Sequence, residues 1–155
     1  MSVYLKTFKI INEWVDYNNH MNMAYYVLIF DRAWEVILSK FNMGSHAAKT
    51  INRSTMVVET NTNYISEVKE GAEVEIYLTY LDHDKKRLHI KFEMIEKNTK
   101  KLSASMEWIS LYIDLNKRKV TEFEEEKVKL MRDFIEKNKS KFTEEALLFT
   151  SKLKK

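Results

Sequence analysis

A short polar segment brings a carboxylate, an imidazole and amide side chains together just before an apolar stretch. Asp16, His20 and Asn22 fall within seven residues, and a helical pattern of apolar residues begins at Met23. Asn22 is a plausible N-cap, because its side-chain oxygen can accept a hydrogen bond from an amide of the first helical turn. The other amides of that turn, including that of Met23, carry partial positive charge and can polarise a carbonyl group. Asp16 lies just upstream and can project toward the same point.

The composition excludes several other kinds of chemistry. The 155 residues include no Cys, four scattered His, no Pro and two Gly. A disulfide framework, a thiolate metal site, a cysteine nucleophile and a Gly-rich phosphate loop are therefore excluded, and we expect no metal and no redox cofactor. The lack of Cys suits a cytoplasmic protein, and no apolar run is long enough for a signal peptide or a membrane span.

The charge pattern argues against a nucleic-acid partner. The net charge is +3, and residues 136–155 alone carry six Lys and three Glu, so the rest of the chain is neutral. A nucleic-acid-binding domain usually has a basic face on its folded body, and none is visible in this sequence. We expect the Lys-rich end to be a solvated helix.

Positioning the polar segment requires an element on either side of it. Residues 3–11 alternate loosely between apolar and polar and predict a strand, whereas residues 23–41 are apolar around most of a helix and predict a buried helix. Further strands are predicted at residues 54–68, 74–80, 88–94 and 103–113. Their hairpin-length connections indicate an antiparallel sheet.

The last part of the chain predicts helices. Residues 121–124 match a capping box, an apolar stripe follows over residues 123–135, and a short second helix is expected from Thr143 to the end. The whole order predicts an α+β fold in which five antiparallel strands wrap round a long helix. Both the hotdog fold and the cystatin-like fold have this arrangement. In the hotdog interpretation, residues 1–120 form the hotdog domain and residues 121–155 a helical extension of the same domain.

The polar segment, Asp16-Tyr-Asn-Asn-His20-Met-Asn22-Met-Ala-Tyr-Tyr26, resembles a known signature. It is that of hotdog-fold acyl-CoA thioesterases of the 4-hydroxybenzoyl-CoA thioesterase type, and the resemblance covers roughly the first three quarters of the chain. It implies that Asp16 is the nucleophile or the general base and that the Met23 N–H is the oxyanion donor. It also places His20 and Asn22 in the catalytic set. His20 would order the loop or transfer protons, Asn22 would cap the helix, and Tyr26 would contact substrate or belong to the core.

One departure from the signature concerns the loop backbone. Asn19 stands where the family has Gly. Asn is the residue other than Gly that best tolerates a left-handed backbone, so Asn19 can keep the turn and its place beside the substrate. The change removes no chemical group that hydrolysis needs.

A narrower resemblance concerns the acyl group. The segments Val58 to Tyr64 and Leu81 to His89 look like those of betainyl-CoA thioesterase domains associated with carnitine dehydrogenases. The betainyl group carries a quaternary ammonium, which aromatic faces and a carboxylate can bind. The rings would come from Trp14, Tyr17, Tyr64 and Trp108, and the carboxylate from Glu59, which the uncharged residues around it suggest is buried. Core packing is the alternative for each ring.

Three basic residues could contact coenzyme A. Lys85, Lys86 and Arg87 follow one another in a predicted turn, where they would either bind the CoA phosphates or form a solvated hairpin tip. Coenzyme A would enter only as part of the substrate, with no other cofactor.

These expectations together describe an acyl-CoA thioesterase. A single curved sheet leaves an open edge, so we expect a homodimer or a tetramer whose active sites draw residues from two subunits. Asp16 and Met23 would come from one chain, and Glu59 from the other. A hotdog enoyl-thioester hydratase and a non-catalytic ligand-binding module are the alternatives, and the identity of the acyl group stays open.

Overall fold

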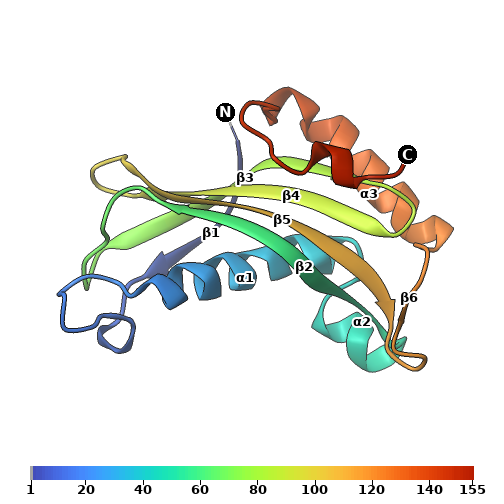
Figure 1. Cartoon of the computed structure of the whole chain (residues 1–155), viewed down its shortest axis with the longest axis horizontal. Helices are drawn as coiled ribbons and strands as arrows, with labels where there is room; N and C mark the ends of the chain where they lie inside the picture. Colours follow the sequence, from blue (N-terminus) through green and yellow to red (C-terminus); the bar gives the residue numbers. More distant parts are fainter. Residues whose placement is uncertain (1) are drawn as a thin grey trace.

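A curved antiparallel sheet forms the body of the computed structural model, which describes residues 2–155 (Figure 1). Its strands follow the order β1-β3-β4-β5-β2, and the two-residue strand β6 pairs with β5. The bounds are Val3–Lys9 for β1, Arg53–Tyr64 for β2, Glu73–His83 for β3, Arg87–Glu96 for β4, Leu102–Asp114 for β5 and Lys119–Val120 for β6. The five long strands are confirmed. The short β6 escaped prediction because two residues carry no periodicity.

The buried helix predicted from Met23 is also confirmed. Helix α1, Met23–Lys40, lies against the concave face of the sheet (Figure 1). Ile29, Phe30 and Ile37 are completely buried there. Trp34 meets Phe92 of β4 edge to face, with ring centroids 5.8 Å apart. One side of α1 is thus buried by a sheet that curves around it, while Met23 and Val27 stay exposed, and the arrangement is the α+β architecture expected from the sequence.

A short helix that the sequence did not suggest follows α1. Helix α2, Ser45–Thr50, begins where the Glu35 side chain of α1 accepts a hydrogen bond from the Ser45 N–H at 2.6 Å. A carboxylate on a neighbouring helix thus pairs with a free N-terminal amide of α2. Such a cap is not visible in the local sequence.

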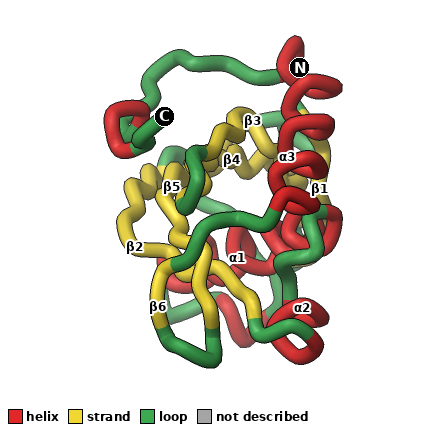
Figure 2. Tube along the Cα trace, turned by 90° about the vertical axis from the view of Figure 1, so that its right-hand side faces the viewer, coloured by secondary structure: helices red, strands yellow, loops and turns green. Residues whose placement is uncertain are grey.

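The C-terminal segment, residues 142–155, lies over the outer face of the sheet, whereas α3, Glu125–Asn138, packs against the end of α1, where Phe134 meets Phe41 with ring centroids 5.5 Å apart (Figures 1 and 2). The predicted capping box at Thr121 is wrong, because α3 begins at Glu125 and Glu124 precedes it as the N-cap. The Glu124 side chain is engaged elsewhere: it accepts hydrogen bonds from Arg53 Nε at 3.1 Å and from the Tyr112 hydroxyl at 2.6 Å.

The predicted helix from Thr143 to the end is wrong as well. Residues 143–149 form no helix, and only a 3-10 turn at Thr150–Lys152 follows. The backbone amides of this segment bond to a carboxylate of β5 and to one of the turn between β3 and β4. Leu148 and Phe149 donate to Glu107 at 2.9 Å, and Lys154 donates to Asp84 at 2.7 Å. Amides paired with the sheet in this way are not available for a helical ladder.

Glu107 and its neighbour His89 form a buried ion pair or hydrogen bond beneath the C-terminal segment. His89 Nε2 lies 2.7 Å from Glu107 Oε2, and both side chains are almost inaccessible to solvent. None of the helices formed by residues 2–155 combines the length and the apolar character that a membrane crossing requires.

Candidate active site

The polar segment forms a closed loop that leads directly into α1. Val15 and Met21 face each other in an isolated β-bridge, and the Asn22 N–H donates to the Trp14 carbonyl at 2.9 Å. Asn19 has a φ of 65°, so it adopts the left-handed backbone that was expected for it. The loop is therefore fixed at both ends by backbone contacts, and it holds its side chains close to the helix N-terminus.

Asp16 is tied to the residue that caps the helix. One carboxylate oxygen, Oδ2, accepts a hydrogen bond from Asn22 Nδ2 at 2.9 Å, and Oδ1 accepts one from the Asn18 N–H at 2.8 Å. The bond from Asn22, followed by that from Asn18, holds the pKa of the Asp16 carboxyl below its usual value of 3.8. The carboxylate is therefore ionised at neutral pH, as a nucleophile or a general base must be.

The predicted N-cap is confirmed. Asn22 Oδ1 accepts the Ala24 N–H at 3.0 Å, and the Asn22 carbonyl accepts the Tyr25 N–H at 3.0 Å. Within residues 2–155, no hydrogen-bond acceptor pairs with the Met23 N–H. This amide is a free donor at the positive end of an 18-residue helix, which suits it to polarise a carbonyl oxygen.

A cavity of about 260 Å³ opens beside Met23, and we call it the acyl cavity. Its lining comes from the loop, α1, the end of β2 and the residues after β2: His20, Met21, Met23, Tyr26, Tyr64, Ile65, Ser66 and Glu67. The rings of Tyr26 and Tyr64 meet edge to face with centroids 5.1 Å apart. Two of the predicted substrate-binding residues are thus brought together in a cavity that Met23 also lines.

The two tyrosine hydroxyls and His20 point toward backbone carbonyls around the cavity. The Tyr26 hydroxyl donates to the Ser66 carbonyl at 3.3 Å, and the Tyr64 hydroxyl donates to the Met23 carbonyl at 3.4 Å. His20 Nδ1 lies 3.1 Å from the Met21 carbonyl oxygen. This local bond is what a loop-ordering histidine would make.

Three other predicted rings lie outside the acyl cavity. Trp108 is buried in the core, where it packs on Phe92 with centroids 4.9 Å apart, so its assignment to a substrate pocket is corrected. Trp14 is also buried, and it stacks on Tyr25 at 6.0 Å. Tyr17 is 92% exposed on the loop. Alternation along a strand does not distinguish a core ring from a pocket ring, which is why the sequence misplaced Trp108.

Glu59 is not the buried carboxylate that the sequence suggested. Its side chain is 45% exposed and pairs with Lys152 Nζ of the C-terminal segment at 3.4 Å. The residues two and four positions further along β2, Asn61 and Asn63, line a hollow on the outer face together with Ala146. Side chains two positions apart share a face of a strand, so Glu59 points to the outer face, away from α1. The uncharged run around it reflects an edge strand rather than burial.

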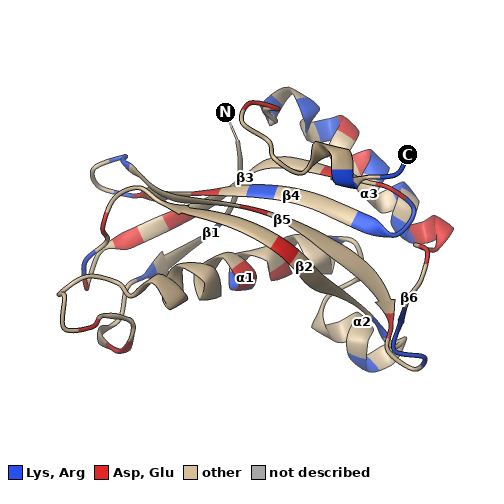
Figure 3. Cartoon of the chain, in the orientation of Figure 1, with Lys and Arg blue, Asp and Glu red and all other residues tan. Residues whose placement is uncertain are grey.

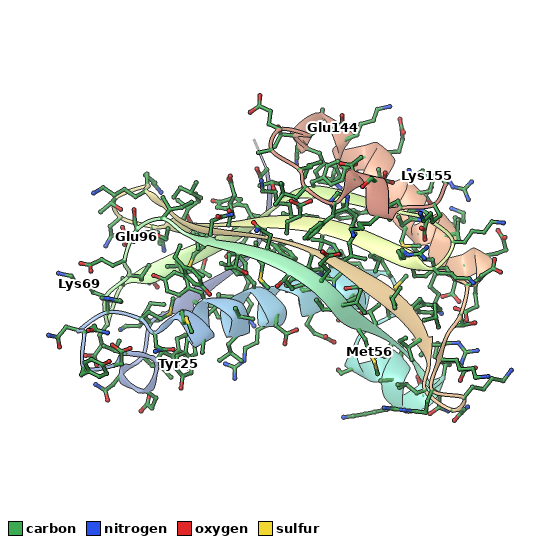
Figure 4. All side chains as sticks on the ribbon, in the orientation of Figure 1. Tyr25, Met56, Lys69, Glu96, Glu144 and Lys155 are labelled. Carbon is green, nitrogen blue, oxygen red and sulfur yellow. The ribbon has the colours of Figure 1, made fainter. Side chains whose placement is uncertain are left out.

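The three basic residues lie far from the loop in the same chain. The loop adjoins the start of β3, because the Met21 N–H donates to the Val68 carbonyl at 2.7 Å, whereas Lys85 and Lys86 follow the end of β3. The 11 residues of β3 span about 36 Å. Arg87 is also paired with Asp84 at 2.9 Å. Figure 4 shows Tyr25 and Lys69 at one end of the molecule and Lys155 at the other.

Sequence reasoning missed one charged residue of the acyl cavity. Glu67 lines it, yet it lies in a stretch that looked like the end of a strand. The only available signal was its position three residues after Tyr64, just before the turn at residues 69–72.

Comparisons with known proteins agree with this architecture. Residues 12–135 match the Thioesterase-like superfamily. Over 128 residues the chain is 34% identical to the betainyl-CoA thioesterase of Pseudomonas aeruginosa, covering 81% of this chain and 80% of that relative. A putative thioesterase from Pseudomonas putida KT2440 superimposes with a TM-score of 0.77 at 26% identity, and the match covers 96% of this chain and 91% of the chain of that thioesterase.

A further solved structure shares the fold. A Staphylococcus aureus protein in complex with CoA superimposes with a TM-score of 0.81 at 20% identity, and the match covers 100% of this chain and 96% of the chain of that protein. The curved sheet around a long helix, together with the matches to the superfamily and to the betainyl-CoA thioesterase, identifies a hotdog-fold thioester hydrolase. The chain belongs to the Thioesterase-like superfamily.

Proposed function

We propose that the protein hydrolyses an acyl-CoA thioester at the N-terminus of α1, with Asp16 as the nucleophile or general base. The observation that carries this proposal is that one helix N-terminus has both a free Met23 N–H and an ionised carboxylate, Asp16, which is hydrogen-bonded to the cap residue Asn22. A thioester needs both a donor for its developing oxyanion and a group that attacks or activates water. Both are supplied within eight residues of the chain.

In this mechanism the thioester carbonyl oxygen accepts a hydrogen bond from the Met23 N–H, which stabilises the charge that develops as the carbonyl carbon is attacked. Asp16 either attacks that carbon itself, forming a mixed anhydride that water then hydrolyses, or removes a proton from an attacking water molecule. Coenzyme A leaves as the thiol, and the acyl group leaves as a carboxylic acid. Asn22 holds Asp16 in place through the 2.9 Å bond to Oδ2.

The acyl group we propose is betainyl. This rests on the 34% identity to the betainyl-CoA thioesterase of Pseudomonas aeruginosa and on the two tyrosine rings of the acyl cavity. Aromatic faces attract a quaternary ammonium through the ring quadrupole. The link to carnitine metabolism expected from the sequence depends on the same acyl specificity and stays a prediction.

A homodimer is proposed from the open edge of the sheet. β2 is the last strand in the sheet order, so one side of its backbone faces no strand of the described chain. Large apolar side chains are exposed along this edge and on the adjoining part of α1, and we call them the edge patch: Met23, Val27, Met56, Val57, Val58, Tyr64 and Ile65. Figure 3 shows β2 and the first turns of α1 almost free of charged residues. A second copy pairing with β2 would cover both the edge and the acyl cavity.

Release of free thiol from a panel of acyl-CoA thioesters tests the proposal. The panel contains short, medium, aromatic and betainyl acyl groups, and Asp16→Asn is the matched variant because it keeps the size and hydrogen-bonding shape of the side chain. We expect turnover with the wild type and a loss of at least about 100-fold in kcat with Asp16→Asn. Equal rates for the two proteins would overturn the role of Asp16, and silence of the wild type on every thioester would overturn the function.

A further inference from the structure

The acyl cavity contains a carboxylate that the mechanism of hydrolysis does not use. Glu67 is the acidic residue among those that line the cavity, and no Lys or Arg of residues 2–155 lines it. The other lining side chains are tyrosines, methionines, Ile65, Ser66 and His20. The cavity therefore offers one negative charge amid aromatic rings and thioethers, which is a suitable environment for a poorly hydrated cation and a poor one for an anion.

Glu67 also lies close enough to Tyr26 for its charge to act on that side chain. Burial, together with the negative charge of Glu67, raises the pKa of the Tyr26 hydroxyl above its usual value of 10.0. The Tyr26 hydroxyl donates to the carbonyl of Ser66, the residue next to Glu67 in the chain. The Glu67 side chain and the Tyr26–Tyr64 pair consequently border the same small space.

Glu67 already has an ion-pair partner, Lys69, which would compete only weakly with a bound cation. Lys69 Nζ lies 3.9 Å from Glu67 Oε1, and both side chains are more than half exposed. An exposed ion pair at this distance gains little energy in water, so a ligand can replace it without a large loss. Lys69 itself lies outside the lining of the acyl cavity.

We propose that Glu67, together with the rings of Tyr26 and Tyr64, binds the quaternary ammonium of the acyl group and sets the specificity of the enzyme. This inference rests on the proposed function and assigns its acyl specificity to a particular residue. In a betainyl thioester one methylene separates the ammonium from the carbonyl carbon, so the cation site must directly adjoin the oxyanion donor. Met23, whose N–H is that donor, lines the same cavity as Glu67 and both tyrosines.

Glu59, which the sequence suggested for this role, is placed elsewhere. It points to the outer face of the sheet and pairs with Lys152, whereas the acyl cavity adjoins α1 on the inner face. If a second copy pairs its β2 with this β2, the two sheets join into one, and the inner and outer faces of each copy stay on the same sides of the joined sheet. Pairing of this kind leaves Glu59 of either copy on the outer side.

A pair of isosteric substrates tests the assignment. Betainyl-CoA and tert-butylacetyl-CoA have the same shape, but a carbon atom replaces the charged nitrogen in the second. The quantity to measure is the ratio of their kcat/KM values, because a general loss of folding or chemistry lowers both and leaves the ratio alone. We expect the wild type to favour betainyl-CoA, and Glu67→Gln to lower the ratio by about 3- to 30-fold. Tyr64→Leu should lower it as well, whereas Tyr64→Phe should retain it.

Two matched controls sharpen the result. Glu59→Gln and Glu70→Gln remove exposed carboxylates that do not line the acyl cavity, so both should keep the wild-type ratio. Three outcomes would overturn the cation-binding role of Glu67 while leaving the thioesterase activity in place. They are a wild-type ratio near one, an unchanged ratio in Glu67→Gln and a lowered ratio in Glu59→Gln. No thiol release from any acyl-CoA would instead overturn the proposed function itself.

Discussion

Asn22 donates its side-chain amide to Asp16 Oδ2 at 2.9 Å while its own Oδ1 caps α1 through the Ala24 N–H at 3.0 Å. A single side chain thus fixes both the carboxylate and the helix terminus that offers the free Met23 N–H. The two groups required for thioester hydrolysis are held in one rigid unit, and their relative position depends on the conformation of Asn22. Substitution of Asn22 should therefore lower stability through the lost cap and kcat through the lost contact with Asp16, and the two effects should be separable.

Two variants of Asn22 distinguish these effects. Serine at this position keeps a good cap but lacks the amide that donates to Asp16, whereas alanine loses both functions. We expect Asn22→Ala to lower the free energy of unfolding by about 1 kcal/mol and Asn22→Ser to change it by a few tenths. Both should reduce kcat. Denaturant unfolding and steady-state kinetics measure the two quantities, and an Asn22→Ser enzyme with wild-type kcat would contradict the positioning role.

The pH dependence of kcat/KM reports on Asp16 in the free enzyme. Its pKa is held below the usual value of 3.8 by Asn22, so the carboxylate stays charged as the pH falls and is protonated only below its ordinary range. We expect no loss of kcat/KM from Asp16 between about pH 8 and pH 5. In Asn22→Ser the largest cause of the lowered pKa is gone, and the acid limb should move upward toward the ordinary value. Identical acid limbs in the two proteins would refute this.

Isotope labelling tests whether Asp16 forms a mixed anhydride that water attacks at the aspartyl carbon. In heavy-oxygen water, a mixed anhydride at Asp16 that is attacked at the aspartyl carbon leaves the label in the enzyme during the first turnover. A general-base mechanism places the label in the released acid in every turnover. Mass spectrometry of the peptide that contains Asp16, after a single turnover with excess enzyme, measures the difference. Label in Asp16 would establish the mixed anhydride, whereas unlabelled Asp16 together with fully labelled acid would exclude water attack at the aspartyl carbon.

Glu107 should be a major source of stability. It is buried and accepts backbone hydrogen bonds from Leu148 and Phe149, in addition to its contact with His89 at 2.7 Å. Glu107→Ala leaves those amides and the buried His89 without their partner, and we expect it to lower the free energy of unfolding by about 3 kcal/mol or more. Glu59→Ala removes only an exposed ion pair with Lys152 and should cost less than about 1 kcal/mol. Equal losses in urea unfolding would be inconsistent with the buried contacts.

The proposed dimer can be tested at the centre of the edge patch. Val58 is 56% exposed in β2, and Val58→Lys would place a charge in an interface built on this edge. We expect a shift from dimer to monomer in light scattering coupled to gel filtration, together with a loss of activity if the partner completes the acyl cavity. Val120→Lys introduces the same change at an exposed apolar residue of β6, outside the patch, and should leave the mass unchanged. A monomeric wild type, or a tetramer, would correct the proposed assembly.

Local patterns predicted much of the fold correctly. The apolar circumference of residues 23–41 and the alternation along residues 74–94 correspond to α1, β3 and β4, because both patterns record burial directly. The cap at Asn22 was predictable because the capping side chain and the amide from which it accepts a hydrogen bond are neighbours in the sequence. The C-terminal segment was not predictable, since its amides bond to Glu107 and Asp84, which are 41 and 70 residues away.

The same distinction explains the outcome for the site. Asp16, Asn22 and Met23 lie in one short loop, so their proximity was visible in the sequence. The role of Glu67 and the placement of Trp108 depend on which face of the sheet each residue meets, and this is determined by tertiary packing. The exposure of Glu59 follows from the place of β2 at the sheet edge, a property of strand order that the sequence does not contain.

The contacts of the C-terminal segment also suggest an order of folding. The bonds from Leu148 to Glu107 and from Lys154 to Asp84 join residues far apart in the chain, and contacts of such large separation are slow to form. The sheet and α1 can assemble first, with Glu107 and His89 still hydrated on the outer face. Docking of the last residues then removes water from that pair. Refolding should therefore show a late step in which His89 and Glu107 lose contact with solvent after the sheet has formed.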